Sequence, residues 1–118
     1  MEARRVGESL IVRLKGELDL NTAEAFKAFV REELAASRRV RHLILDLRAV
    51  PFIDSSGVGA ILGRYREIKE ERAGRLIAWG PRQPVRRVLA LSGLVRVMDV
   101  VDTQQEALAL LKEGNRNP

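Results

Sequence analysis

An aspartate and two serines stand in the stretch PFIDSSGVGAILGRY, residues 51–65, where the residue types are most suggestive of chemistry. A serine hydroxyl can act as a nucleophile or accept a phosphoryl group, and all three side chains are good helix caps. The following residues have a helical pattern, yet they include Gly59 and Gly63. Each glycine costs about 1 kcal/mol relative to alanine inside a helix. The stretch therefore needs an explanation for a hydroxyl at a turn, followed by a helix with a bare face.

A dinucleotide site is one explanation of the glycines. Gly57, Gly59 and Gly63 have the spacing G-x-G-x-x-x-G before a helix, which is close to the nucleotide-binding fingerprint. In that fingerprint the glycines follow a strand directly, and an acidic residue ends the next strand to bind the ribose. Here RAVPFID intervenes, and the next strand-like segment ends at Trp79 and a glycine. The pattern disfavours a nucleotide-binding enzyme.

A nucleophilic serine enzyme is a second explanation. The hydrolase elbow requires G-x-S-x-G, whereas this chain has IDSSG. The only histidine, His42, begins a strand-like segment and is expected to be a partly buried strand residue. Asp54 adjoins Ser55, but a carboxylate without a relay is a poor base for an alcohol. We therefore expect no enzymatic activity and no catalytic residue.

A structural role and a docking role remain for this stretch. Small residues form one stripe of the predicted helix, beside an apolar stripe that would face the core. The small stripe is Ser56, Gly59, Ala60 and Gly63, and the apolar stripe is Val58, Ile61, Leu62, Tyr65 and Ile68. A bare stripe permits close approach of a partner protein, although close packing within the domain would use it equally well. A phosphate on a serine here would be tolerated by the helix N-terminus and repelled by the neighbouring aspartate, so it would act mainly on a docked partner.

Segments with strand-like and helix-like periodicity alternate along the chain. The strand-like segments are 9–20, 41–47, 74–80 and 95–101, and the helix-like segments are 21–37, 57–72, 81–93 and 103–112. The opening residues add a possible edge strand, joined to the next by a hairpin at Gly7 and Glu8. This alternation predicts a single α/β domain over residues 1–118. We expect a mixed, mostly parallel sheet of four to five strands, about four helices and a frayed tail at 112–118.

Capping signals support these helix boundaries. Asn21, with a glutamate three residues later, can cap the first helix, and Thr103 with Glu106 forms a capping box for the last. Pro84 suits the first turn of the third helix, and Gly93 suits its C-terminal cap.

Composition excludes several classes of function. The 118 residues include no cysteine, so no disulfide or thiolate metal site forms, and no segment has the length of a signal peptide or a membrane span. We expect a cytoplasmic protein without a membrane partner.

The net charge of +5 raises nucleic acid as a partner, but Arg31, Arg66 and Arg72 alternate with glutamates as on a solvated helix face. The basic cluster at 38–41 lacks an aromatic neighbour for base stacking, so we expect no direct nucleic-acid binding and leave an acidic protein partner open.

Three stretches resemble a known family. GELDLNTAEAF, DSSGVGAILGRYREIK and LSGLVRVMDVVDTQQEAL are similar to the STAS-domain anti-sigma-factor antagonists, and particularly to those of the sporulation sigma factor F system. The resemblance extends from Val6 to Leu111. It implies a STAS fold and a partner-switching protein. In that family the unphosphorylated antagonist binds an anti-sigma factor that is also a serine kinase, and a sigma factor is released.

The resemblance also implies roles for individual residues. The kinase, using its own ATP and magnesium, would phosphorylate Ser55 and end binding, and a serine phosphatase would restore the protein; the chain itself would need no cofactor or metal. The partner-binding positions implied are Asp19, Asp54, Ser56, Gly57 and Gly59. Asp19 serves equally well as a turn or cap residue, and the roles of Gly63 and Arg64 stay open. A general-stress sigma-system antagonist and a small-molecule-binding STAS module are the alternatives.

Overall fold

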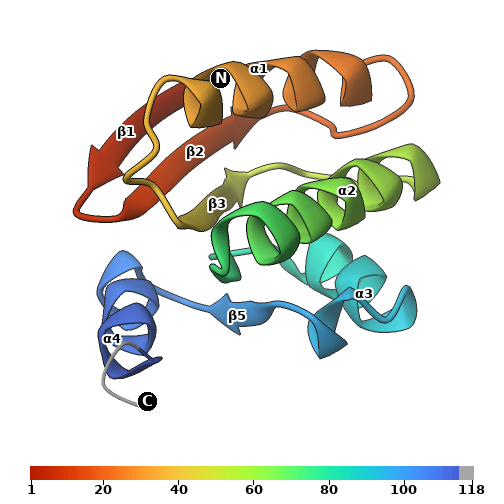
Figure 1. Cartoon of the computed structure of the whole chain (residues 1–118). Coiled ribbons are helices and arrows are strands. Elements are labelled where there is room, and N and C mark those ends of the chain that lie inside the picture. The colour runs from red at the N-terminus through yellow and green to blue at the C-terminus, as the bar shows by residue number, and fades with distance from the viewer. Residues whose placement is uncertain (115–118) are drawn as a thin grey trace.

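The computed structural model describes residues 1–114 and consists of a five-stranded sheet with helices on both faces (Figure 1). The strands are β1 (Glu2–Val6), β2 (Ser9–Lys15), β3 (His42–Ala49), β4 (Leu76–Trp79) and β5 (Asp99–Val101). The helices are α1 (Ala23–Ala35), α2 (Ser55–Arg72), α3 (Gln83–Leu91), the short 3₁₀ helix η1 (Leu94–Arg96) and α4 (Gln104–Gly114).

The strands are ordered β1-β2-β3-β4-β5 across the sheet, which is their order along the chain. β1 pairs antiparallel with β2, and the other three pairings are parallel. The predicted hairpin is present, and Gly7 adopts the positive φ of +57° that its tight turn requires. The predicted mixed, mostly parallel sheet is confirmed.

Two apolar clusters fill the two faces of the sheet. The larger joins α1, α2 and α3 to one face, with Phe26 and Ile61 packed among residues of β2 and β3 such as Leu10 and Leu45. The smaller joins α4 to the opposite face, where Leu111 packs with the residues of β4 and β5. Figure 1 shows α1 and α2 side by side on their face, and the two helices contact each other there.

The strand predicted at 95–101 is wrong over its first half. Gly93 has a φ of +84° and introduces η1, and the Met98 N–H donates to the Leu94 carbonyl oxygen at 3.1 Å. Leu94 and Met98 are both buried, four residues apart, which is the spacing of a helical turn rather than a strand. Only the last three residues of the predicted strand pair in the sheet.

The capping predictions had mixed outcomes. Thr103 caps α4 by accepting from the Glu106 N–H at 3.1 Å, as predicted. The prediction that Asn21 caps α1 is wrong, because Thr22 occupies the N-cap position. Pro84 lies in the first turn of α3, and Gly93 follows its capping residue in the left-handed conformation.

The predicted fraying of 112–114 is wrong, because α4 continues to Gly114. Residues 115–118 of the predicted frayed tail lie outside the described residues.

The prediction that Arg72 lies on a solvated helix face is also wrong. Its guanidinium donates to the carbonyl oxygens of Leu34, Ser37 and Val40 at 2.7, 2.9 and 2.6 Å. These carbonyl groups lie in the last turn of α1 and the loop behind it. Since the final carbonyls of a helix lack intrahelical partners, Arg72 caps α1 from the end of α2 and ties the two helices together.

Candidate functional site

Asp54 starts helix α2 and leaves Ser55 exposed as its first residue. The Asp54 backbone is extended, and its Oδ1 accepts from the Gly57 N–H at 3.0 Å, as expected of a helix cap. Ser55 is exposed and Ser56 is half-buried. No hydrogen bond joins the Ser55 hydroxyl to another described residue. Of the three possible caps in the sequence, the structure uses the aspartate and leaves the first serine hydroxyl available to a partner.

The second oxygen of Asp54 joins α2 to the loop between β2 and α1. Oδ2 accepts from the Leu20 N–H at 3.2 Å, and the Asp54 N–H donates to the Leu18 carbonyl oxygen at 3.2 Å. An isolated parallel bridge between Leu18 and Ile53 completes the connection. The loop that carries Asp19 and the turn that carries Ser55 therefore form one continuous surface, although 36 positions separate them in the sequence.

Asp19 shapes its own loop. Its Oδ1 accepts from the N–H groups of Asn21 and Thr22 at 2.9 and 3.2 Å, and its carbonyl oxygen accepts from the Ala23 N–H at 2.8 Å. This is the turn role that the sequence allowed for Asp19. The side chain is only half-buried, so contact with a partner stays a prediction.

The glycines of α2 differ sharply in their surroundings. A Cβ at Gly57 would lie 2.4 Å from the Leu18 carbonyl oxygen and 2.7 Å from Ile53 Cγ2. Gly57 is buried, so it serves the close packing of α2 on the adjoining loop and does not face outward. At Gly59 and Gly63, by contrast, no described atom lies within 4 Å of an added Cβ. The bare face predicted for the helix is therefore present at these two positions.

On α2 the predicted face is wrong at Ala60, and Arg64, whose role the sequence left open, is buried. Ala60 is fully buried and belongs to the core, not to the exposed stripe. Arg64 is 3% exposed and pairs with Glu67 at 2.5 Å, while its Nε and Nη1 find no acceptor among the described residues. The buried side of α2 follows Gly57, Ile61, Arg64 and Ile68, which is rotated from the predicted stripe. A lone arginine gives no sequence signal of burial, because arginines are almost always exposed.

Two large apolar side chains near Ser55 were missed by the sequence analysis. Leu20 is 74% exposed and Phe52 is 45% exposed, one on each of the two joined loops. Next to Phe52, a groove of about 500 Å³ is lined by residues of α3 that include Pro84 and Val88. Leu20 was missed because it fell at the end of a predicted strand. The exposed serine thus lies beside apolar surface of the kind that protein partners cover.

His42 cannot assist Ser55. It begins β3, at the opposite end of that strand from the turn that leads to α2, and its Nδ1 accepts from the Arg75 N–H at 3.0 Å. Burial lowers the pKa of His42, with a further lowering by the nearby Arg41 guanidinium. The expected place of His42 in a strand is confirmed, and the residue is buried where the sequence predicted only partial burial. Among residues 1–114, no three His, Cys, Asp or Glu side chains gather as metal ligands, and none of the helices described is long and apolar enough to cross a membrane.

A family model supplies the assignment that geometry alone does not. The model described as the STAS domain matches residues 1–107. The chain belongs to the STAS family. Within it, the chain is 39% identical to the anti-sigma F factor antagonist of Paenibacillus polymyxa over 103 residues, which are 87% of this chain and 86% of that protein. The expected resemblance to anti-sigma-factor antagonists is confirmed.

Solved structures agree with this assignment. The STAS chain superposes on the anti-sigma factor antagonist SpoIIAA in its unphosphorylated form with a TM-score of 0.80 and 34% identity, covering 95% of this chain and 96% of that one. The Bacillus cell fate determinant SpoIIAA in its phosphorylated form gives a TM-score of 0.69 at 35% identity, with 92% and 96% of the chains covered.

Proposed function

We propose that this STAS protein is an anti-sigma factor antagonist that binds an anti-sigma factor through the surface around the start of α2. Binding would release the sigma factor that the anti-sigma factor holds. The observation that carries the proposal is the exposed hydroxyl of Ser55 at the first position of a capped helix, where none of the residues 1–114 hydrogen-bonds to it. The exposed Leu20 and Phe52 beside it, and the bare helix face at Gly59, supply surface for a partner. Similarity to antagonists at 39% identity supports the same function.

Phosphorylation of Ser55 would end binding. The partner, acting as a serine kinase with its own ATP and magnesium, positions the γ-phosphorus for attack by Ser55 Oγ. The new O–P bond forms as the bond to ADP breaks, and the hydroxyl proton passes to a base of the kinase. The product carries about −1.5 to −2 charges at neutral pH. Asp54 already occupies the cap and repels that charge, so the phosphate projects toward the partner.

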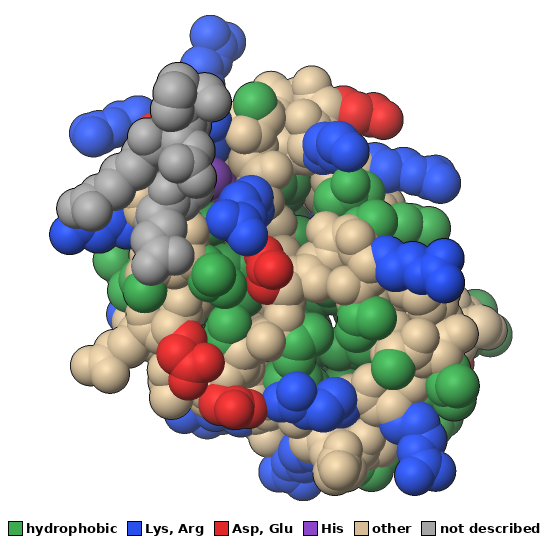
Figure 2. Space-filling view, turned by 90° about the horizontal axis from the view of Figure 1, so that it is seen from below, with side chains coloured by type: hydrophobic (Ala, Val, Ile, Leu, Met, Phe, Trp, Pro, Cys, Tyr) green, Lys and Arg blue, Asp and Glu red, His purple; other side chains and the backbone are tan. Residues whose placement is uncertain are grey.

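The proposed cycle includes two further partners. A serine phosphatase restores the hydroxyl. The sigma factor belongs to a sporulation system, a proposal supported by the similarity to proteins named anti-sigma F factor antagonists. Nucleic acid is not among the proposed partners. Figure 2 shows lysine and arginine side chains spread around the face that it presents, with hydrophobic side chains between them, rather than gathered in one basic patch.

The first test is phosphorylation by the cognate anti-sigma kinase with ATP, mapped by mass spectrometry. We expect modification at Ser55 and none in Ser55→Ala. The matched control is Ser56→Ala, which should still be modified because the neighbouring hydroxyl is intact. No modification at Ser55, in an assay where a known antagonist is modified, would refute the proposal.

Binding of the anti-sigma factor provides the second test. Ser55→Ala should bind and stay bound when ATP is added, whereas Ser55→Asp should bind more weakly because it places a negative charge at the contact. Gly59→Leu should weaken binding without lowering the melting temperature, because no described atom opposes a side chain there. A Gly59→Leu protein that melts early but binds normally per folded molecule would place Gly59 outside the interface.

A further inference from the structure

On the sheet face opposite α1 and α2, a helix covers only the half formed by β4 and β5. Residues paired across neighbouring strands project to the same face, and two such rows run across this one. One row is Glu2, Arg13, Asp46 and Trp79, and the next is Arg4, Ile11, Ile44 and Ile77. Helix α4 packs on β4 and β5 at one end of these rows. Side chains of β1, β2 and β3 cover the remainder of the face.

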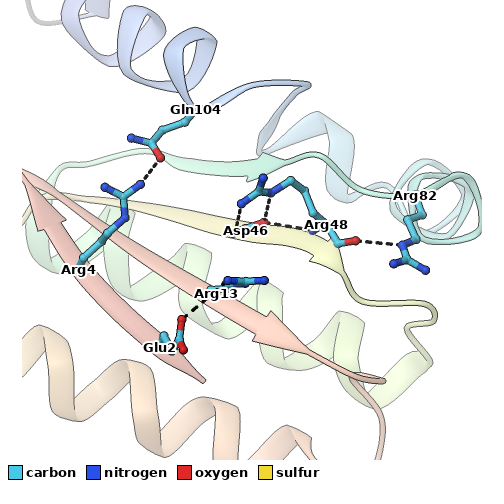
Figure 3. A network of polar contacts seen from close by, with 7 residues as sticks. All are labelled: Glu2, Arg4, Arg13, Asp46, Arg48, Arg82 and Gln104. Carbon is cyan, nitrogen blue, oxygen red and sulfur yellow. Dashed lines mark hydrogen bonds and ion pairs between the residues drawn. The ribbon is translucent and has the colours of Figure 1, made fainter.

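A hollow of about 370 Å³ lies over this uncovered half. Arg4, Arg13 and Arg48, which come from three adjacent strands, line it together with Ile11 and Trp79. Two carboxylates, Glu2 and Asp46, also belong to its lining. Its size is in the range of small-molecule pockets, and its lining combines an apolar floor with walls in which three guanidinium groups outnumber two carboxylates. The hollow shares none of its lining with the surface around Ser55. Figure 3 shows the arginines of this face and their polar partners.

Arg48 is fixed within the wall of the hollow. Its Nε and Nη2 each donate to the buried carboxylate of Asp46 at 2.9 Å, and its guanidinium lies 3.9 Å from the centre of the Trp79 ring. The hydrogen bond to Asp46 raises the pKa of Arg48. This bidentate pair stacked on an aromatic ring forms a flat, rigid surface against which a second planar group can stack.

Arg4 and Arg13 have weaker partners. Arg4 donates to the neutral side chain of Gln104 at the start of α4. Arg13 faces Glu2 at 4.0 Å, and these two side chains are 46% and 68% exposed, so the ion pair contributes little. Each guanidinium carries a fork of donors suited to a carboxylate or a phosphate. The guanidinium groups of Arg4 and Arg13 thus lie beside the apolar floor. Among the described residues, no buried carboxylate pairs with either of them.

We infer that this hollow binds a small organic anion with a flat apolar body. The carboxylate or phosphate lies between Arg4 and Arg13, and the body rests on Ile11 against the stacked pair of Arg48 and Trp79. The inference goes beyond the proposed function and does not depend on it, because the hollow and the Ser55 surface have no residue in common.

Trp79 makes the inference directly measurable, because it is the only tryptophan of the chain and lines the hollow. The full chain is titrated with phenyl phosphate and with benzoate while tryptophan fluorescence is recorded. These probes share the ring and differ in the anion, so they distinguish a phosphate site from a carboxylate site. Benzyl alcohol lacks the charge and inorganic phosphate lacks the ring. We expect a saturable change with at least one aromatic anion and a weaker one with both controls.

Matched arginine variants separate a built site from general attraction to a basic protein. Arg4→Gln combined with Arg13→Gln should raise the dissociation constant at least about tenfold, equivalent to about 1.4 kcal/mol. The control is Arg5→Gln, which removes a charge from the same strand on the opposite face, where Arg5 pairs with Glu33 of α1. It should change the dissociation constant less than about twofold.

Two results would overturn the inference. One is the absence of a saturable fluorescence change with either aromatic anion up to about 10 mM, a concentration well above the dissociation constant of even a weak millimolar site. The other is an equal loss of affinity in the Arg5→Gln control, which would mean that the anion is attracted by the overall positive charge and not by a built site. Thermal unfolding of each variant confirms that the compared proteins are folded.

Discussion

Replacing Gly57 with alanine probes the most crowded contact at the start of α2. The new Cβ would lie 2.4 Å from the Leu18 carbonyl oxygen, and real Cβ atoms essentially never approach other atoms within 3.0 Å. The opposing atom belongs to the backbone, so it cannot rotate away as a side chain would. Relief requires the loop at Leu18 to move, and that carbonyl oxygen accepts the hydrogen bond from the Asp54 N–H.

The expected cost follows from three contributions. Overpacking costs about 1–3 kcal/mol. Weakening the bond from Asp54 to Leu18 adds up to about 1 kcal/mol. Against this, alanine is favoured over glycine in a helix by up to about 1 kcal/mol. The net destabilisation of Gly57→Ala is therefore about 1–3 kcal/mol.

Thermal unfolding by circular dichroism measures this difference. With an entropy of unfolding of about 2.1 cal/mol/K per residue, 1 kcal/mol corresponds to about 4 °C in Tm for 118 residues. Gly57→Ala should lower the Tm by about 4–12 °C. The matched control is Gly59→Ala, two residues along the same helix, which should raise it by about 2–4 °C because helix propensity improves and nothing clashes.

Two results with this pair of variants would contradict the packing described for Gly57 and Gly59. An unchanged or higher Tm in Gly57→Ala would show that the loop at Leu18 yields freely and that packing does not require a glycine at that position. A fall in Gly59→Ala as large as that in Gly57→Ala would refute the assignment of Gly59 to open surface.

Three further outcomes are expected. Asp54→Ala should lower the free energy of unfolding in urea by about 1–2 kcal/mol through loss of the helix cap, whereas Asp54→Asn, which still caps, should lose less; equal losses would point to the charge instead. Arg72→Met should destabilise by about 2 kcal/mol, since it leaves three carbonyl groups behind α1 without their donor, and Arg66→Met, at an exposed position, should not. Because the pKa of His42 is lowered in the folded state, the unfolded state binds more protons near pH 6, so stability is full above the unfolded pKa of about 6.5 and falls as the pH drops below it. His42→Gln should flatten that part of the profile, and an equally steep decline would assign it to other groups.

Local patterns carried most of the fold. The buried strand at 41–47, the hairpin at Gly7 and the Thr103 cap depend on periodicity and turn chemistry that neighbouring residues define. The 3₁₀ turn at Leu94 was missed because its apolar residues alternate with polar ones over too few positions to separate a strand from a helical turn.

The candidate site was predictable in position but not in detail. Gly57 and Gly59 are equivalent in the sequence, and only the approach of the Leu18 loop makes one crowded and the other open. The buried side of α2 includes Arg64, which the sequence did not indicate because the burial of an arginine depends on its tertiary packing. Phe52 gave no signal of exposure, since the turn that presents it is set by pairing with a distant loop.

The order of the strands also bears on how the chain acquires its structure during synthesis. Because the spatial order β1-β2-β3-β4-β5 is the order of translation, each strand emerges from the ribosome when its neighbour already exists. The hairpin of β1 and β2 closes the shortest loop and offers a template at once, and each later strand needs only one helical crossover to reach the growing edge. No early strand has to wait, exposed, for a partner from the far end of the chain, which limits the time that a bare sheet edge is available for aggregation.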